Sequence, residues 1–352
     1  SILSFLKSSA AEVRRDRMER EYKVSIICAV FNHEKYLRQA FDSFLSQKTD
    51  FKYEIVVTDD ASTDTSRAII REYAEKYPDI FAPIYFDKNM YQQRIPVVPL
   101  YAIPAARGEY LAFCEGDDYW TDPEKLQLQA DWLDAHPDYS ACVHNTMNYY
   151  CDTGTEQPYA ARYSGDCDLG FADVVHGVGG VFHTSAVMAR AELFRDMPEF
   201  CMVSERHGVG DHPRALLFAM RGKIRYIDRF MSVYRNNSTP TAWTSRLREN
   251  AFLVDRLTGA VEMYRAALPC VSGDERKLLE HTLHEYEWEL MQARGDYADM
   301  KRGVYKEITE EKPMSQRLWL DFKLHFPRAY CAYMKKRGRE SGIPEKLKSK
   351  YM

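Results

Sequence analysis

The chain has 352 residues, of which 45% are hydrophobic and 28% are charged, a composition that excludes low-complexity and intrinsically disordered proteins. Its net charge of −4 argues against general nucleic-acid binding, and no apolar run reaches the roughly 18 residues of a membrane-spanning helix. The eight cysteines form no C-x-x-C pair, which excludes the usual spacing of a zinc knuckle or dithiol redox site. The N-terminal segment lacks the order of a secretory signal, so we expect a cytoplasmic protein.

The first recognisable unit is a β-α-β motif. An apolar run rich in β-branched residues, 23–31, predicts a buried strand that ends at Asn32. Apolar residues at intervals of four predict a helix over 34–47, and residues 53–58 predict a second strand. Together they predict two parallel strands joined by a right-handed crossover.

The same alternation continues along the chain. Strands are predicted at 83–86 and 109–114, and a helix at 123–135. Further on, Asp211 opens a predicted helix and residues 223–228 a predicted strand. This order predicts an open α/β sheet that binds its ligands beyond the carboxyl ends of the strands.

Periodicity from about residue 245 to 308 is almost wholly helical, which predicts a helical C-terminal region. The predicted organisation is an N-terminal helical extension at 1–21, an α/β domain at 22–240 and a helical region at 241–352.

Three carboxylates lie within four positions at the end of a predicted strand, in Glu115-Gly116-Asp117-Asp118. Such crowding is costly without a nearby cation, and hard oxygen ligands suit Mg²⁺ or Mn²⁺. The alternative is a solvated turn that caps the helix beginning near Pro123.

Asp59 and Asp60 open a second acidic turn, which continues to Asp64 at the end of another parallel strand. Its Ser, Thr and Asp residues are also the types that cap a following helix. Because parallel strands bring their carboxyl ends to one edge, a metal and a nucleotide could share that edge.

Three blocks resemble inverting family 2 glycosyltransferases of the GT-A fold: KVSIICAVFN at 23–32, EIVVTDDASTD at 54–64 and RGEYLAFCEGDDYWTDPEKLQLQ at 107–129. The resemblance covers about 22–240, and it implies that this is a catalytic domain with a nucleotide-binding half at 22–120 and an acceptor half at 121–240. It implies a Rossmann-like, mostly parallel sheet flanked by helices. It also implies a hexosyltransferase that moves a sugar from a nucleotide diphosphate donor, a UDP-sugar, to a hydroxyl of a glycan or lipid-linked acceptor in surface polysaccharide biosynthesis. No G-x-G-x-x-G follows the first strand, which disfavours a dehydrogenase.

Carried over by position, the resemblance assigns the donor nucleotide to Ala29, Phe31, Asn32, Glu34, Asp59, Asp60, Glu115 and Arg235. Asp59 or Asp60 would accept the uracil N3 proton. Asp117 and Asp118 would bind Mn²⁺ or Mg²⁺ at the family's D-x-D position, where Glu115 replaces the first Asp and could contact ribose or metal. Because of that replacement, a non-catalytic nucleotide-sugar or glycan-binding protein of the same fold is the alternative.

The family's acidic base lies near a helix start about a hundred residues after the metal motif, where this chain has Asp211. The alternative role for Asp211 is an N-cap, with Pro213 in the first turn. Arg235 could bind the diphosphate bidentately, or could be an ordinary surface arginine.

The tail, 317–352, has ten Lys or Arg residues against three acids, a net charge of +7, and aromatic residues lie between them. This mixture predicts either peripheral binding to an anionic membrane at its inner face or aromatics that pack into a core.

Overall fold

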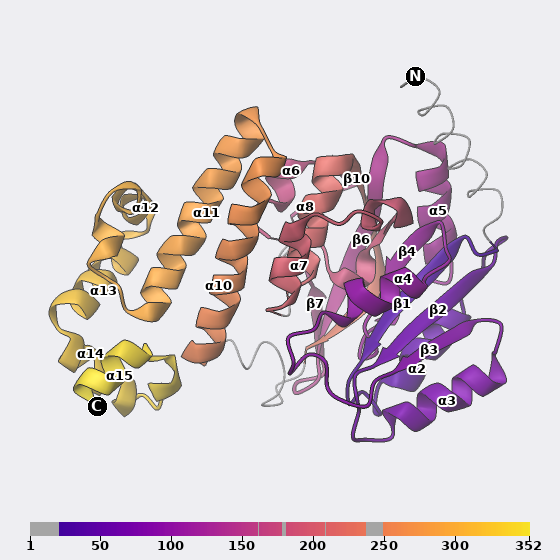
Figure 1. Ribbon diagram of the computed structural model, residues 1–352, viewed down its shortest axis with the longest axis horizontal. Helices are drawn as coiled ribbons and strands as arrows, with labels where there is room; N and C mark the ends of the chain where they lie inside the picture. The colour runs from indigo at the N-terminus through magenta and orange to yellow at the C-terminus, as the bar shows by residue number, and fades with distance from the viewer. Residues whose placement is uncertain (1–20, 161, 178–180, 208, 237–248) are drawn as a thin grey trace. The chain divides into compact units, whose positions relative to one another are not determined.

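The strands form a mixed sheet that is parallel in its first half and antiparallel in its second (Figure 1). The computed structural model describes residues 21–160, 162–177, 181–207, 209–236 and 249–352. The strand order is β3-β2-β1-β4-β9-β6-β10-β5, with β7 paired to β6 and β8 to β10. The strands are β1 (Val24–Val30), β2 (Tyr53–Asp59), β3 (Phe81–Tyr85), β4 (Tyr110–Phe113), β5 (Tyr119–Trp120), β6 (Tyr139–Tyr150), β7 (Thr155–Pro158), β8 (Cys167–Leu169), β9 (Met188–Arg190) and β10 (Lys223–Asn236).

The chain divides into two compact units. The first comprises the residues up to Tyr150, Gly154–Met197 and Arg214–Arg235, and the second comprises Cys151–Thr153, Pro198–Pro213 and Asn236–Met352. The helices of the first unit are α2 (Leu37–Leu45), α3 (Ser66–Lys76), α4 (Ile103–Ala105), α5 (Lys125–Ala135) and α6 (Phe171–Val174). Helix α8 (Asp211–Arg221) begins in the second unit and continues in the first.

The second unit is helical. It contains α7 (Glu199–Glu205), α10 (Asn250–Ala267), α11 (Gly273–Arg294), α12 (Val304–Glu311), α13 (Met314–His325), α14 (Pro327–Lys336) and α15 (Glu345–Tyr351). The predicted domain boundary near residue 240 stays a prediction, and the N-terminal extension lies outside the described residues except for Glu21. Across the described residues, no helix combines the length and apolarity needed to cross a bilayer.

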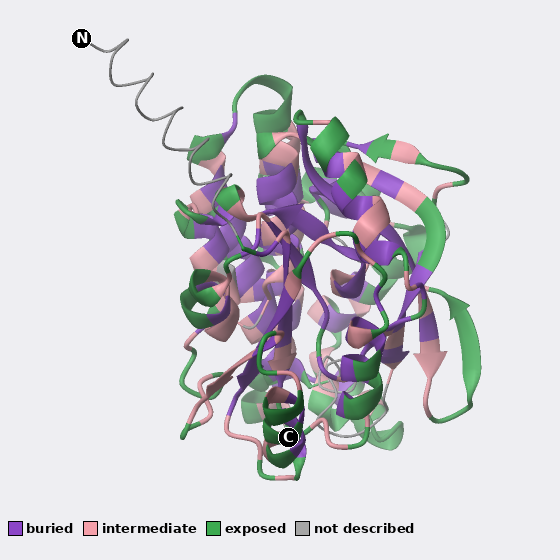
Figure 2. Ribbon diagram, turned by 90° about the vertical axis from the view of Figure 1, so that its right-hand side faces the viewer, coloured by how far each residue is buried: buried purple, intermediate pink, exposed green. Residues whose placement is uncertain are grey.

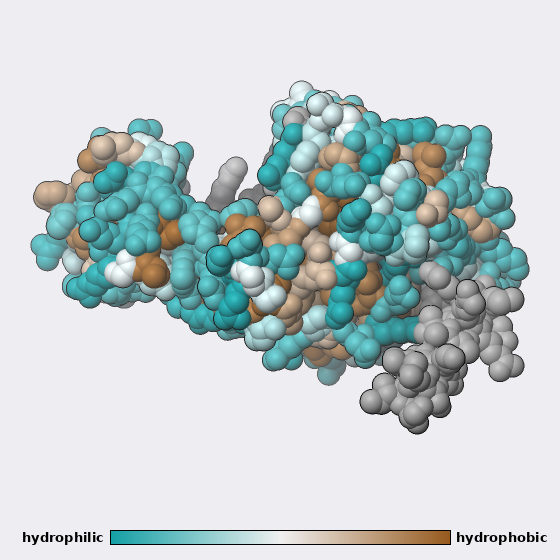
Figure 3. Space-filling model, turned by 90° about the horizontal axis from the view of Figure 1, so that it is seen from above, coloured by the Kyte–Doolittle hydropathy of each residue, from teal (hydrophilic) through white to brown (hydrophobic). Residues whose placement is uncertain are grey.

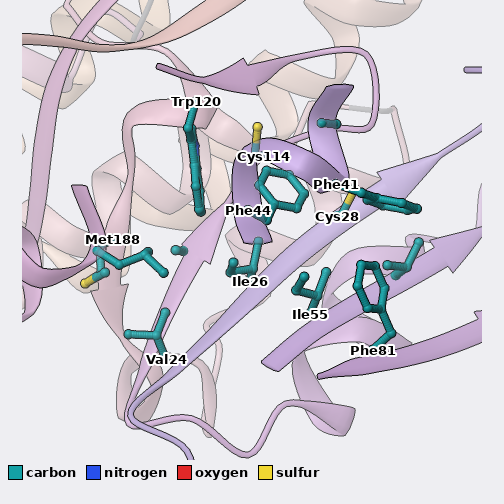
Figure 4. Close-up of a cluster of buried hydrophobic side chains, with 14 of the residues drawn as sticks. Val24, Ile26, Cys28, Phe41, Phe44, Ile55, Phe81, Cys114, Trp120 and Met188 are labelled. Atoms are coloured by element: carbon teal, nitrogen blue, oxygen red, sulfur yellow. The ribbon is translucent and has the colours of Figure 1, made fainter. Parts of the chain in front are cut away.

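Both faces of the sheet are buried, which explains the continuous apolar run of β1 (Figure 2). Ile26 and Cys28 face one core, with Phe41 and Phe44 of α2 (Figure 4). Ile27, between them in sequence, faces the other core, to which α8 contributes Ala215 and Phe218. The predicted α/β sheet with helices on its faces is confirmed.

Among the differences between the sheet and the sequence prediction, two bear on the site. Strand β6 was not predicted, because its His144, Asn145, Thr146 and Asn148 resemble a polar loop although all four are buried. Strand β10 was predicted to end at 228 but runs to Asn236. Arg235 therefore belongs to the strand rather than to a loop after it.

A buried carboxylate joins three segments at the amino end of the sheet. Glu54 on β2 is fully buried, and its Oε1 accepts hydrogen bonds from Ser25 Oγ at 2.6 Å and from the backbone N–H of Arg107 at 2.6 Å. The Arg107 guanidinium completes the pair through Oε2, with Nε at 2.8 Å and Nη2 at 2.6 Å. Next to it, Gly108 has no room for a Cβ, which would lie 2.4 Å from the backbone N of Ser25. Arg107 therefore fixes the start of β4.

We predict that Arg107→Ala destabilises the protein much more than Arg38→Ala. Removing Arg107 leaves the buried Glu54 without its counter-charge, a loss of about 3 kcal/mol. Arg38 makes a similar pair with Glu72, but both side chains are about half exposed, and such pairs contribute roughly 1 kcal/mol or less. Urea unfolding curves followed by circular dichroism would measure the difference. Equal shifts of the two midpoints would contradict a structural role for the Glu54 pair.

Candidate active site

The loops that follow β1 and β2 are joined by hydrogen bonds between backbone and side chains. Asn32 Oδ1 accepts from the Thr63 N–H at 2.8 Å, and the Asn32 N–H donates to Ser62 Oγ at 3.0 Å. Glu34 repeats the pattern, since its Oε2 accepts from the Thr65 N–H at 3.0 Å. Asn32 has a φ of +58°, a conformation that Asn tolerates better than most residues. These contacts hold the carboxyl ends of β1 and β2 together as one rigid edge.

The acidic turn after β4 lies against this edge. The Gly116 N–H donates to the Ala29 carbonyl at 3.0 Å, and the Asp118 N–H donates to the Glu115 carbonyl at 3.1 Å. A Cβ on Gly116 would lie 2.9 Å from side-chain atoms of Val30 and Leu37, so packing leaves room only for glycine. The chain thus turns sharply and directs three carboxylates to the place where β1 ends.

Arg235, on β10, holds the acidic turn in place through hydrogen bonds. Its backbone N–H donates to Asp118 Oδ1 at 3.0 Å, while its guanidinium donates to the Asp117 carbonyl and to Gln39 Oε1. The guanidinium carbon lies 5.0 Å from the ring centroid of Tyr36 and 4.4 Å from that of Tyr119. Arg235 is only 6% exposed, which excludes the ordinary surface arginine of the sequence analysis.

Two carboxylate oxygens of the turn are buried without a hydrogen-bond partner, Asp117 Oδ1 and Asp118 Oδ2. Burial raises the pKa of Asp118 well above its usual range, and the charges of Asp117 and Glu115 raise it further. Imidazole nitrogens lie at 3.8 Å on both sides, His33 Nε2 from Asp117 and His183 Nδ1 from Asp118.

This donor set fits a divalent cation. Hard carboxylate oxygens that are buried, close together and unpaired are stabilised by a bound cation, and they suit Mg²⁺ or Mn²⁺. Within the described part of the chain, no group of three or more His, Cys, Asp or Glu side chains is arranged to hold a metal by itself. A metal at Asp117 and Asp118 would therefore need further oxygen ligands, from water or from a substrate.

The two acids after β2 have different environments. Asp59 is fully buried, and its Oδ2 accepts from Arg67 Nε at 2.5 Å. Asp60 is 8% exposed and accepts from the backbone N–H groups of Met90 at 2.6 Å and Tyr91 at 3.1 Å. Asp59 is thus held by a partly exposed counter-ion, Arg67, whereas Asp60 orders the segment after β3.

A buried polar layer that the sequence analysis did not identify continues inward from His183. Ser232 Oγ lies 2.9 Å from both Ser185 Oγ and Thr146 Oγ1. Lys125 is fully buried, with Nζ 2.7 Å from Gln129 Oε1 and 4.1 Å from the ring centroid of Trp120. Thr146 and Ser232 are single buried polar residues on β6 and β10, which give no periodic signal, so only the tertiary structure reveals the layer.

Asp211 lies in the second compact unit, and its assignment as a base stays a prediction. Its Oδ1 accepts from the N–H of the next residue, His212, at 2.8 Å. An N-cap usually accepts from the second or third amide beyond it, so this contact is not the typical capping bond. His212 is buried, and its Nε2 lies 3.0 Å from the Tyr264 hydroxyl.

Residues 25–197 match the model of the family described as "Glycosyl transferase family 2". The chain belongs to glycosyltransferase family 2. Its curated relatives include "Uncharacterized protein Rv1520" of Mycobacterium tuberculosis, 34% identical over 72% of this chain and 70% of the relative. "Putative glycosyltransferase EpsE" of Bacillus subtilis is 33% identical over 33% of this chain and 40% of the relative. Family membership makes the protein an enzyme, a glycosyltransferase, rather than the non-catalytic binding protein of the alternative.

Solved structures of glycosyltransferases share the fold. TarS residues 1–349 of S. aureus in complex with UDP-GlcNAc align with a TM-score of 0.59 at 16% identity, over 94% of this chain and 91% of that one. The mannosyltransferase PcManGT of Pyrobaculum calidifontis, in complex with GDP-Man and Mn²⁺, aligns with a TM-score of 0.50 at 16% identity, over 92% and 86%. The predicted GT-A fold is therefore confirmed.

We predict that Lys125→Met flattens the pH dependence of stability. Burial lowers the pKa of Lys125 to about 7 from an ordinary 10.5. The unfolded chain keeps this proton up to about pH 10, so unfolding takes up a proton between pH 7 and 10, and stability rises with pH in that window. Below pH 7 both states are protonated and the full cost of burying the cation remains.

The advantage of Lys125→Met over wild type should therefore be largest below pH 7 and shrink toward pH 10. Urea titrations across this range would measure it, with Lys76→Met, an exposed lysine on α3, as the control. A constant difference between Lys125→Met and wild type would show that Lys125 does not change its charge in this window.

Proposed function

We propose that this glycosyltransferase transfers a hexose from a UDP-sugar, in a metal-dependent and inverting reaction, to a hydroxyl of a glycan or lipid-linked acceptor. The observation that carries the proposal is the pair of buried, unpartnered carboxylate oxygens of Asp117 and Asp118 at the carboxyl edge of the sheet. Ligands of open α/β sheets bind at this edge. The UDP, UDP-GlcNAc and GDP-Man held by proteins of the same fold are consistent with a nucleotide diphosphate donor.

In this proposal Asp117 and Asp118 hold Mn²⁺ or Mg²⁺, and Glu115, which is exposed, faces the ribose or the metal. The cation would neutralise the charge that develops on the diphosphate as the nucleotide leaves. The chain itself would hold the carboxylates of Asp117 and Asp118 close together before the donor binds.

Arg235 supports that task. Its Nη1 and Nη2 donate to the Asp117 carbonyl and to Gln39 Oε1, and its charge lies beside the carboxylates. We therefore assign it the anchoring of the acidic turn, with its positive charge favouring the diphosphate at short range, in place of the bidentate contact expected from the sequence.

The nucleoside would bind along the backbone of Ala29, Phe31 and Asn32. Asp60 is the better candidate of the two acids for the uracil N3 proton, since the Asp59 carboxylate is fully buried against Arg67. Glu34 accepts a hydrogen bond from the Thr65 hydroxyl and so orders the loop after β2. It would affect nucleoside binding by fixing the conformation of this loop.

Asp211 would act as the general base. A carboxylate can take the proton of the acceptor hydroxyl as its oxygen attacks the anomeric carbon opposite the nucleotide, which inverts the configuration. The order of the family's motifs along the chain supports this assignment.

The acceptor class comes from relatives. "Putative teichuronic acid biosynthesis glycosyltransferase TuaG" and "Poly(ribitol-phosphate) beta-glucosyltransferase", both from Bacillus, carry polymer names and match 31% and 28% of this chain. A role in surface polysaccharide biosynthesis, with a lipid-linked acceptor met at the inner face of the cell membrane, follows as a proposal.

We predict that Asp117→Asn weakens UDP binding in Mn²⁺ to the level measured in EDTA. Asparagine keeps the shape but removes the charge that holds the cation. The loss should be at least the roughly 10- to 100-fold that removal of an outer-shell metal partner costs. Isothermal titration calorimetry with UDP would measure it, and Asp131→Asn, an exposed acid on α5, is the control. Equal UDP affinity with and without Mn²⁺ would remove the metal from the mechanism.

We predict that Asp211→Asn lowers kcat by roughly 10²-fold or more while UDP affinity stays near that of wild type, as expected when a general base is lost. A screen of UDP-sugars for slow hydrolysis identifies the donor, and turnover is then compared between the two proteins. The midpoint of thermal unfolding would show whether a lower turnover comes from a loss of catalysis or from a loss of folded protein. A variant with wild-type turnover and a lowered midpoint would assign Asp211 to the helix start alone.

A further inference from the structure

The aromatic residues of the C-terminal tail fall into two groups, one buried and one exposed. Leu320, Tyr330 and Cys331 are buried in a core with Trp288 and Tyr297 of the same compact unit. Part of the tail therefore packs as an ordinary helical core. Deleting the whole tail would remove part of this core. A test of the exposed group therefore needs substitutions of single exposed residues.

The second group lies on the surface of α13 and α14 and is called the aromatic surface. Its members are Met314, Leu318, Trp319, Phe326 and Tyr333, which are between 38% and 64% exposed. The rings of Trp319 and Tyr333 lie 5.6 Å apart, so the two helices contribute to one patch. On the face of the protein seen in Figure 3, apolar side chains lie among polar ones.

Cations without counter-ions accompany the aromatic surface. Residues 326–339 contain five Lys or Arg and no acid. Lys335, Lys336 and Arg339 are exposed, and in the described part of the chain no carboxylate lies within ion-pair distance of them. Lys346 and Lys348, further along, are paired with Asp296 and Glu345 at 2.7 and 2.6 Å. The unpaired charge is thus concentrated beside the exposed rings.

We infer that the aromatic surface and these cations dock the protein onto an anionic phospholipid bilayer. Exposed Trp, Tyr and Phe insert at headgroup depth, and neighbouring Lys and Arg attract anionic lipid headgroups. An acidic protein partner would satisfy the cations but would not require five partly exposed apolar side chains beside them. The inference extends the proposed function, but it does not depend on the transfer reaction, because vesicle binding is measured without turnover.

The test uses the full chain and vesicles of phosphatidylglycerol and phosphatidylcholine in equal amounts, compared with vesicles of phosphatidylcholine alone. Sedimentation at low salt should show binding only to the anionic vesicles, and the binding should weaken as ionic strength rises. Replacing Lys335, Lys336 and Arg339 together by Gln should weaken it by about a hundredfold, at about fivefold per cation. The matched control replaces Lys48, Lys52 and Lys76, which are exposed lysines of the first unit, by Gln and should bind as wild type does.

Insertion of the aromatic surface has its own measurement. Lipids with brominated acyl chains should quench the tryptophan emission of wild type, and Trp319→Phe should lose most of that quenching. Leu318→Ser with Phe326→Ser, both 61% exposed, should reduce binding without loss of fold.

Absence of binding at low salt, equal binding to both vesicle types, or equal binding of the Gln triple variant and its control would each overturn the inference. Self-association that Leu318→Ser and Phe326→Ser abolish, without vesicle binding, would overturn it in favour of an interface between two copies of the chain.

Discussion

The site depends on the crowding of like charges in a place that water hardly reaches. Asp117 and Asp118 are adjacent, Asp118 is only 1% exposed, and each has a buried oxygen without a partner. Such a pair is unfavourable by itself, and its cost is lowered by fixed positive charge, by protonation or by a bound cation. Arg235 provides the fixed charge from β10, and its position between Tyr36 and Tyr119 prevents it from swinging into water.

The rest of the first unit explains how the turn is held under this repulsion. The turn is bonded to β1 through Gly116, to β10 through Arg235, and its neighbouring loops are bonded to each other through Asn32 and Glu34. At the opposite end, Arg107 and Glu54 fix the start of β4. The carboxylates are therefore placed by rigid strands, which is the condition for binding a cation without reorganisation.

The helical unit shows a different use of charge. Its interior contains the buried Lys323, whose pKa burial lowers to about 8. Its surface carries cations that nothing in the described chain neutralises. Burial of the Lys323 cation costs stability, whereas the exposed cations leave a surface whose charge is available to a partner.

The sequence by itself determined the β-α-β order, the two acidic turns and their place at one edge of the sheet, because these follow from local periodicity and from the geometry of parallel strands. Tertiary structure alone decided three points. It paired Asp59 with Arg67, it placed Arg235 inside a strand against the acidic turn, and it buried the polar residues of β6. Asp59 and Arg67 are only eight residues apart, but the other two points depend on contacts between residues far apart in the chain. In each case the exposure and ion pairing of a side chain are set by its neighbours in space rather than by its position in the sequence.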